Sequence, residues 1–167
     1  GADIRQANDF GSTPMIMACE GGHLDVAQWL FENGEDIRQA YSNGITPMIM
    51  ACEGGHLDVA KWLFEKGAAA DIRQANRYGW TPMSLACRNG HLEVAKWLVD
   101  NGEDIRKGDS MATPMNRACH GGHLNVVQWL FNHGADDLRT PNSIGKTPME
   151  GACKGCHLKV AKWLFEN

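Results

Sequence analysis

The chain has 167 residues, a formal net charge of −4 and 43% hydrophobic residues, a composition typical of one globular domain. No apolar run approaches the roughly 18 residues that span a bilayer, and the first ten residues lack the basic start and apolar stretch of a signal peptide. The lack of a long apolar run excludes a membrane-spanning protein. The pI near 6.0 is not that of a strongly basic protein and gives no case for a nucleic-acid partner.

The tripeptide Thr-Pro-Met recurs five times along the chain at a nearly constant spacing. A Trp follows the Thr of each tripeptide after 16 residues, so all variation in length lies between that Trp and the next Thr-Pro-Met. We expect a single domain of five repeats, each with a packed constant part and a variable surface loop. The repeats start their constant parts at Thr13, Thr46, Thr81, Thr113 and Thr147, and they span about residues 1–34, 35–67, 68–102, 103–134 and 135–167.

Each constant part predicts two short helices. Thr13 is a good N-cap and Pro14 suits the first helical position, while Gly22 would end the helix in a left-handed conformation. A second helix is predicted from about Leu24 to the glycine at 34. Helices of about eleven residues or fewer are not stable alone in water, so each antiparallel pair must pack against its neighbours.

The repeated pattern TPM..AC..GHL.VA.WLF..GAD resembles the ankyrin repeat at that family's period, over the whole chain. The resemblance implies an all-α solenoid of stacked antiparallel helix pairs with β-hairpin-like finger loops. The His that usually follows Thr-Pro-Leu and the Asn that follows Gly-Ala-Asp-Val are both replaced in all five repeats, so we expect no Asn hydroxylation site. The replacements are Ile16, Ile49, Ser84, Asn116 and Glu150 for His, and Arg5, Arg38, Arg73, Arg106 and Arg139 for Asn.

The repeats are unequal in their similarity and in their expected stability. The first two differ at only two of 22 positions, Gln28/Lys61 and Asn33/Lys66, which favours a duplicated or designed array, and the chain ends favour a segment of a longer array. The fifth repeat has Glu150 and Gly151 in its first helix and Cys156 where the others have Gly. We therefore expect the fifth repeat to open before the second and third repeats.

A Cys precedes a His by four residues in every repeat, a spacing that superficially suggests metal ligands or thiol–imidazole pairs. Equivalent residues of adjacent helical repeats should lie about 8–10 Å apart, too far for four ligands to reach one zinc ion. We expect buried structural cysteines, no metal and no cofactor. The run from Cys153 to His157 also spells the haem-attachment motif CxxCH, but only Cys156 in it departs from the repeat, so no haem is expected.

The variable positions predict a binding surface on the fingers and on the first helices. Bulky apolar residues at loop tips are typical of interface anchors, although they could instead pack on the adjacent finger. The middle repeat is the richest, and Trp80 lies outside the repeated Trp series. The predicted partner-binding residues are Phe10, Met17, Tyr41, Ile45, Met50, Arg77, Tyr78, Trp80, Leu85, Arg88, Met111, Arg117, His120 and Ile144.

Charge is distributed unevenly along the array. Residues 1–66 carry ten acidic and four basic side chains, whereas residues 67–167 carry ten acidic and twelve basic ones. Such a field would orient a charged protein partner.

We predict a monomeric, non-catalytic protein–protein interaction module. We expect it in the cytoplasm or in the nucleus, because free thiols in every repeat suit a reducing compartment. The alternative is a structural or designed scaffold without a dedicated ligand.

Overall fold

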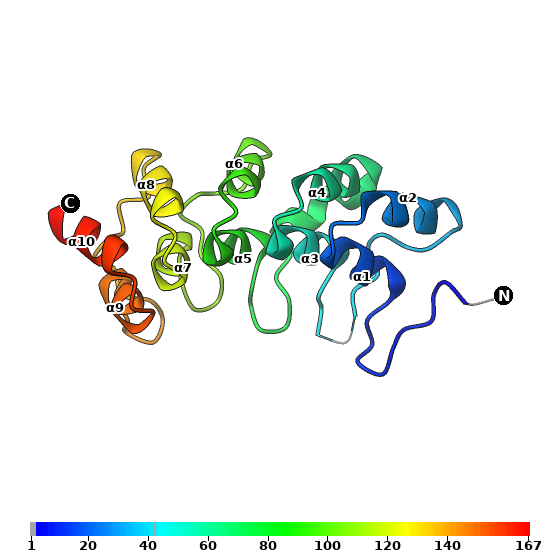
Figure 1. Ribbon diagram of the computed structural model, residues 1–167, viewed down its shortest axis with the longest axis horizontal. Helices are drawn as coiled ribbons and strands as arrows, with labels where there is room; N and C mark the ends of the chain where they lie inside the picture. Colours follow the sequence, from blue (N-terminus) through cyan, green and yellow to red (C-terminus); the bar gives the residue numbers. More distant parts are fainter. Residues whose placement is uncertain (1–2, 42) are drawn as a thin grey trace. The chain divides into compact units, whose positions relative to one another are not determined.

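The computed structural model describes residues 3–41 and 43–167, which form ten α-helices and no strand (Figure 1). The predicted all-α fold of helix pairs is therefore confirmed. The pairs are α1 (Pro14–Glu20) with α2 (Leu24–Glu32), α3 (Pro47–Gly54) with α4 (Leu57–Leu63), α5 (Pro82–Asn89) with α6 (Leu92–Asp100), α7 (Pro114–Gly121) with α8 (Leu124–Asn132), and α9 (Pro148–Lys154) with α10 (Leu158–Glu166).

The Thr-Pro dipeptide starts the first helix of a pair, as predicted. The Thr13 hydroxyl accepts a hydrogen bond from the backbone N–H of Ile16 at 3.4 Å, and Thr46 caps α3 through Ile49 at 3.2 Å. A proline follows in the first turn, where its missing N–H leaves no bond unmade. The sequence thus fixes where these helices begin.

The start of α9 is stronger than the sequence predicted. The backbone N–H of Thr147 donates to Glu150 Oε2 at 2.7 Å, while the Glu150 N–H donates to the Thr147 hydroxyl at 3.3 Å. This reciprocal capping box satisfies two otherwise unpaired backbone groups at the helix start. The interpretation of Glu150 as a weakness of the fifth repeat was therefore wrong.

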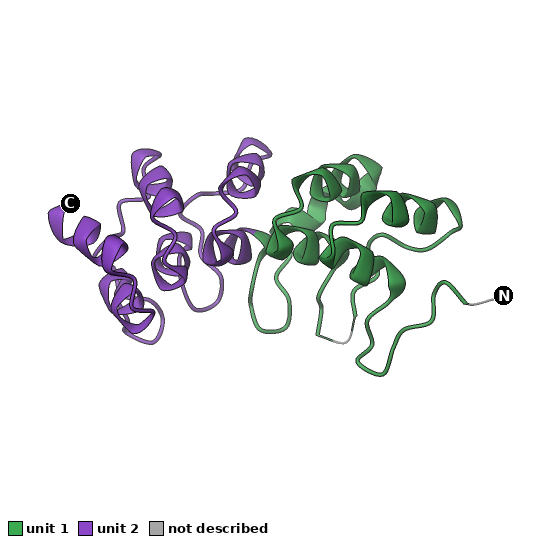
Figure 2. Cartoon of the chain, viewed as in Figure 1, with its two compact units in different colours: residues 1–82 green, residues 83–167 purple. Residues whose placement is uncertain are grey.

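The chain divides into two compact units, residues 1–82 and residues 83–167 (Figure 2). In unit 1, α1 packs against α3 and α2 packs against α4, so first helices and second helices form two layers. Met15 and Met48 are fully buried between them. The Phe31 ring on α2 meets the Trp62 ring on α4 edge-on, with centroids 5.8 Å apart.

Unit 2 repeats this packing in its last two pairs. There α7 packs against α9, and α8 contacts α10. Phe131 on α8 meets Trp163 on α10 in the same edge-on arrangement, with centroids 5.3 Å apart. An aromatic ring of one second helix thus packs on the Trp of the next, which explains why the Trp recurs at a fixed distance from Thr-Pro.

The longest spacing between Thr-Pro dipeptides is filled by packed structure. After α4 the chain continues through the short helices η1 (Phe64–Ala68) and η2 (Ala69–Arg73). Ala68 and Ile72 in this stretch are buried. The expectation that all variable stretches are surface loops was wrong here, because this stretch forms short helical turns and buries apolar side chains in the core.

The fingers are closed turns without strand ladders among the described residues. In the finger that precedes α5 in the sequence, the Asn76 side chain accepts hydrogen bonds from the backbone N–H groups of Tyr78 at 2.9 Å and Trp80 at 3.0 Å. Asn142 holds the finger before α9 in the same way, through Ile144 and Lys146. These two fingers are therefore held by hydrogen bonds within their own turns.

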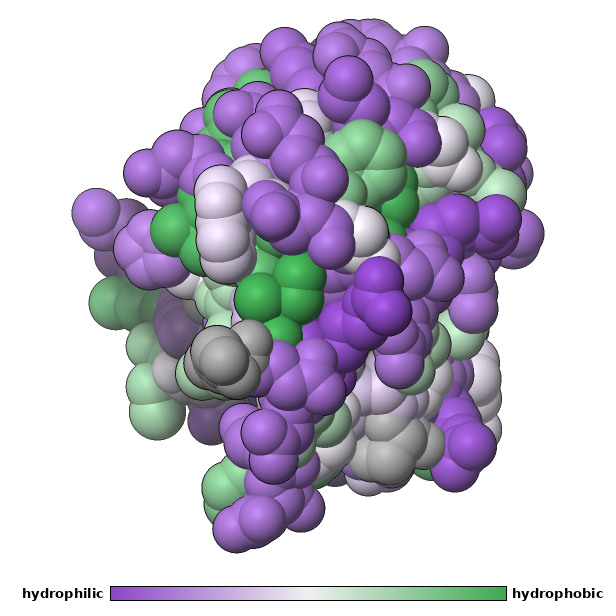
Figure 3. Space-filling model, turned by 90° about the vertical axis from the view of Figure 1, so that its right-hand side faces the viewer, coloured by the Kyte–Doolittle hydropathy of each residue, from purple (hydrophilic) through white to green (hydrophobic). Residues whose placement is uncertain are grey.

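One surface of the molecule is mainly hydrophilic. In the space-filling view of Figure 3, a small group of hydrophobic residues lies among a larger number of hydrophilic ones. Trp29 is 53% exposed although its counterpart Trp62 is only 7% exposed. The same sequence position is therefore surface in one repeat and core in the next.

Candidate functional site

Four of the repeated cysteines belong to the core. Cys19, Cys52, Cys87 and Cys119 are buried, and none forms a disulfide. Burial raises the pKa of Cys87 to about 12, and burial followed by the charge of Glu35 does the same for Cys19. A thiol with so high a pKa is protonated and a poor nucleophile at neutral pH. The predicted structural role is confirmed for these four residues.

The repeated histidines connect one helix pair to the preceding pair. The His56 ring donates through Nε2 to the carbonyl of Glu20 at 2.9 Å, and His157 does the same to the carbonyl of His120 at 3.0 Å. Each ring also lies against a glycine, so that a Cβ built on Gly122 would lie 2.2 Å from the His157 ring. No group of three His, Cys, Asp or Glu side chains within residues 3–41 and 43–167 is placed to hold a metal ion.

The fifth pair departs from this pattern in its cysteines. Cys153 is exposed, so the expectation of a buried cysteine in every repeat was wrong at this position: Cys153 lines a shallow hollow with Cys156 and Leu158 and nothing covers it among the described residues. Cys156 is exposed, as expected, and its φ of 58° is left-handed. Among the described residues it is the only non-glycine with a positive φ.

We expect Cys156→Gly to raise the free energy of unfolding by about 1–2 kcal/mol, because glycine adopts the left-handed conformation without a Cβ clash. Urea denaturation followed by circular dichroism measures the change. Cys156→Ala is the matched control, since it removes the thiol and keeps the Cβ, and it should leave the stability nearly unchanged. An equal gain in both variants would contradict the role of backbone strain.

Most of the predicted finger residues reach solvent. Tyr78 is exposed and lies beside the half-buried Trp80, with ring centroids 6.2 Å apart. Neighbouring fingers are joined through their backbones, because the Arg77 N–H donates to the Asn43 carbonyl at 2.8 Å. The other predicted finger residues are either exposed or half-buried: Phe10, Tyr41, Ile45, Met111 and Ile144.

The predicted residues of the first helices are less uniform. Met17 and His120 are exposed, and Met50, Arg88 and Arg117 are half-buried. Leu85 is only 2% exposed. The placement of Leu85 on the exposed face was therefore wrong, since its side chain is packed in the core and offers a partner almost no surface.

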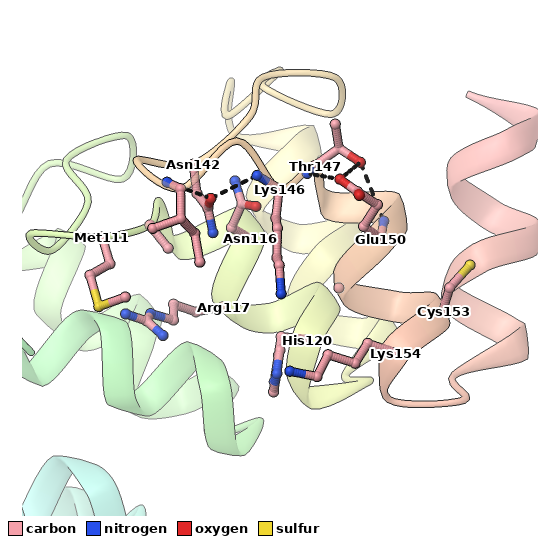
Figure 4. A pocket seen from close by; sticks show the side chains of 13 residues that line it. Met111, Asn116, Arg117, His120, Asn142, Lys146, Thr147, Glu150, Cys153 and Lys154 are labelled. Carbon is pink, nitrogen blue, oxygen red and sulfur yellow. Dashed lines mark hydrogen bonds between the residues drawn. The ribbon is translucent and has the colours of Figure 1, made fainter.

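Unit 2 contains a pocket of about 400 Å³ below two fingers and above the first helices α7 and α9 (Figure 4). It brings together four of the predicted residues, Met111, Arg117, His120 and Ile144. Lys146 points down into it from the finger, and Lys154 extends from α9 toward His120. Ten other predicted residues do not line this pocket.

The sequence analysis did not include Asn142 and Lys146 in the predicted surface. A signal for Asn142 exists, because Asn stands five residues before Thr-Pro at Asn8, Asn76 and Asn142, the spacing of the closed finger turn. Lys146 gives no such signal. A solvent-exposed lysine before Thr-Pro is seen to be part of a site only when the pocket is known.

Two charged groups at the pocket have fixed environments. Arg117 donates to the Asp109 carboxylate through Nε at 2.7 Å and through a terminal nitrogen at 3.0 Å. Burial raises the pKa of Asp109, but the bonds from Arg117 and from the backbone outweigh burial and leave the pKa below its ordinary value. The charge of Arg117 is therefore balanced inside the protein.

His120 experiences a positive environment. Burial, and then the charges of Arg88, Lys154, Arg117 and His157, lower its pKa below the ordinary value. The imidazole is therefore mainly neutral at pH 7. The charged groups that act on His120 are all cationic.

Comparison with known proteins agrees with the helix pairs and their spacing. The family model described as ankyrin repeats (3 copies) matches residues 1–74, 28–109 and 107–167. The chain belongs to the ankyrin-repeat family. No curated protein sequence matches it at a significant level. Ankyrin repeats are in general protein–protein interaction modules and are typically non-catalytic. None of the helices in the described parts of the chain is long and apolar enough to cross a membrane.

Proposed function

We propose that the chain is a non-catalytic module that binds a protein partner through its fingers and the adjoining faces of its first helices. Exposed apolar finger tips carry this proposal: Phe10 is 80% and Ile144 58% exposed, although the core accommodates many residues of the same kind. Solvent-facing apolar anchors on rigid turns are typical of protein interfaces. The module acts as a monomer in a reducing compartment, the cytoplasm or nucleus, which is consistent with its four buried free thiols.

Affinity capture with matched variants tests this proposal. The immobilised chain is exposed to reducing lysate beside a finger variant, Tyr78→Ser with Trp80→Ala, and a control variant, Leu158→Ser with Phe165→Ser on α10. Leu158 and Phe165 are exposed apolar residues outside the fingers. A partner should be retained by the chain and the control, and should be depleted at least about tenfold on the finger variant. Equal recovery on all three would contradict the proposed surface.

The single substitution Trp80→Ala is expected to weaken the identified partner by at least about 2 kcal/mol, the usual threshold of a hot spot, because Trp80 lies beside Tyr78 in the finger. Isothermal titration calorimetry with the purified partner measures this loss. The melting temperature of the variant is the control. If Trp80→Ala lowers it as far as Trp62→Ala does, Trp80 serves the packing between fingers and the hot-spot assignment is wrong.

The near identity of the first two repeats favours a second candidate function. Residues 13–34 and 46–67 differ at two positions only, as they would in a scaffold duplicated or designed for stability. A scaffold has no dedicated ligand. It would therefore capture nothing that depends on the fingers, an outcome that the same experiment distinguishes.

A further inference from the structure

The pocket of unit 2 exists because one helix position has no side chain. Gly151 stands four residues after Thr147, where the other first helices carry Met17, Met50, Leu85 and Arg117. A Cβ built at Gly151 would meet His120 at an ordinary 3.5 Å, so the backbone does not require a glycine there. The missing side chain leaves space between α7 and α9 that a larger residue would fill.

Two cations of the pocket, Lys146 and Lys154, point into it or across its floor. Neither Lys146 nor Lys154 has an ion-pair partner among the described residues, and both are exposed. Arg117 is held by Asp109, and the one carboxylate in the lining, Glu150, is held by Thr147. The lysines are therefore available to an anion.

The opposite wall of the pocket is apolar. Met111 and Ile144 come from adjacent fingers and are 39% and 58% exposed. Their distance is fixed because the Ser143 N–H and hydroxyl both donate to the Met111 carbonyl, at 2.9 and 3.1 Å. A ligand that uses the whole pocket must combine negative charge with an apolar group.

We propose, building on the proposed function, that this pocket binds an acidic segment of the partner protein. A Glu or Asp carboxylate lies against Lys146 and Lys154, and a neighbouring aliphatic side chain lies between Met111 and Ile144. A peptide fits better than a nucleic acid, because the pocket has an apolar wall of Met111 and Ile144 and no Phe, Tyr or Trp side chain in its lining for base stacking.

A peptide titration on the complete chain tests the inference. The probe is the capped hexapeptide Glu-Glu-Leu-Leu-Glu-Glu, and NMR of the isotope-labelled protein follows the backbone signals of residues 142–154. The neutral peptide Gln-Gln-Leu-Leu-Gln-Gln and the polar peptide Glu-Glu-Ser-Ser-Glu-Glu separate the two features of the ligand. We expect each to bind at least about fivefold more weakly than the probe. Equal binding of all three peptides would overturn the inference.

Two variants locate the binding in this pocket. Gly151→Met fills the space with the residue found at the same position of the first two repeats, and the pair Lys146→Gln with Lys154→Gln removes the free cations. Both variants should bind the probe peptide at least about fivefold more weakly. If one variant proves unstable, the other still tests the pocket. The matched control, Lys159→Gln with Lys162→Gln, changes the net charge equally on exposed positions of α10 and should bind unchanged. An equal loss in the control would overturn the inference.

A competition experiment separates peptide from nucleic acid. A single-stranded oligothymidylate added to the probe complex should not displace the peptide. If the oligothymidylate displaces the probe at a lower concentration than unlabelled peptide does, the pocket binds nucleic acid and the inference is overturned. The capture experiment above depends on Tyr78 and Trp80 of unit 1, so loss of peptide binding with a retained partner would reject only this inference.

Discussion

Trp62→Ala is expected to lower the free energy of unfolding by about 3–5 kcal/mol, whereas Trp29→Ala lowers it by no more than about 2 kcal/mol. The two tryptophans occupy the same position of repeats that are nearly identical in sequence. Trp62 is 7% exposed and packs edge-on against Phe31, while Trp29 is 53% exposed. The difference between the variants therefore measures what packing by the preceding repeat contributes.

Urea denaturation followed by far-ultraviolet circular dichroism measures both variants. Stacked repeats need not unfold in one step, so the transition is fitted with coupled neighbouring repeats rather than as two states. Phe31→Ala is an independent control, because it removes the ring that covers Trp62 and should make Trp62→Ala less costly when the two changes are combined. Equal losses for Trp62→Ala and Trp29→Ala would contradict the importance of this packing.

The fold was predictable because its signals are local and repeated. Thr13 caps α1 and Pro14 occupies its first turn, and both effects depend only on neighbouring residues in the sequence. The same pair of residues stands at the start of every first helix. The regular repeat length then predicts that successive helix pairs stack, because helices as short as α4 are stable only when they pack against neighbours. Local chemistry and repetition together lead to the stacked helix pairs.

Burial was less predictable, because it depends on what lies next to a position. Leu85 shares its place in the repeat with the exposed Met17 and yet is buried, and Cys153 shares its place with the buried Cys119 and yet is exposed. The residues of one repeat do not show which side chains of other elements pack on it. Assignments carried from one repeat to the next therefore fail where the surroundings differ.

The candidate site shows the same limit. His120 and Arg117 were identified as groove residues, but Lys146 was not, because an isolated lysine in a loop has no pattern. The pocket also depends on an absence, the missing side chain at Gly151. From the sequence alone, a glycine inside a helix indicates only that the helix is less stable there. Only the structure shows that it opens a space between charged and apolar walls.

Gly122→Ala is expected to lower the free energy of unfolding by about 2–4 kcal/mol, which combines left-handed strain with an overlap between the new Cβ and the His157 ring. Gly122 has a φ of 81°, and its added Cβ would lie 2.2 Å from the His157 ring. Gly145→Ala is the matched control: its φ is 77°, but nothing lies within 4 Å of the added Cβ. It should lose only about 1–2 kcal/mol, the strain alone.

The double variant Gly122→Ala with His157→Ala identifies the overlap. Removing the His157 ring frees the space for the new Cβ, so the combined loss should be smaller than the two single losses added together. His157→Ala alone gives up the hydrogen bond to the His120 carbonyl, which is 3.0 Å long. Strictly additive losses, together with equal losses for Gly122→Ala and Gly145→Ala, would show that the ring moves aside freely. The Gly-His pairing would then reflect helix ends alone and not the fit between successive repeats.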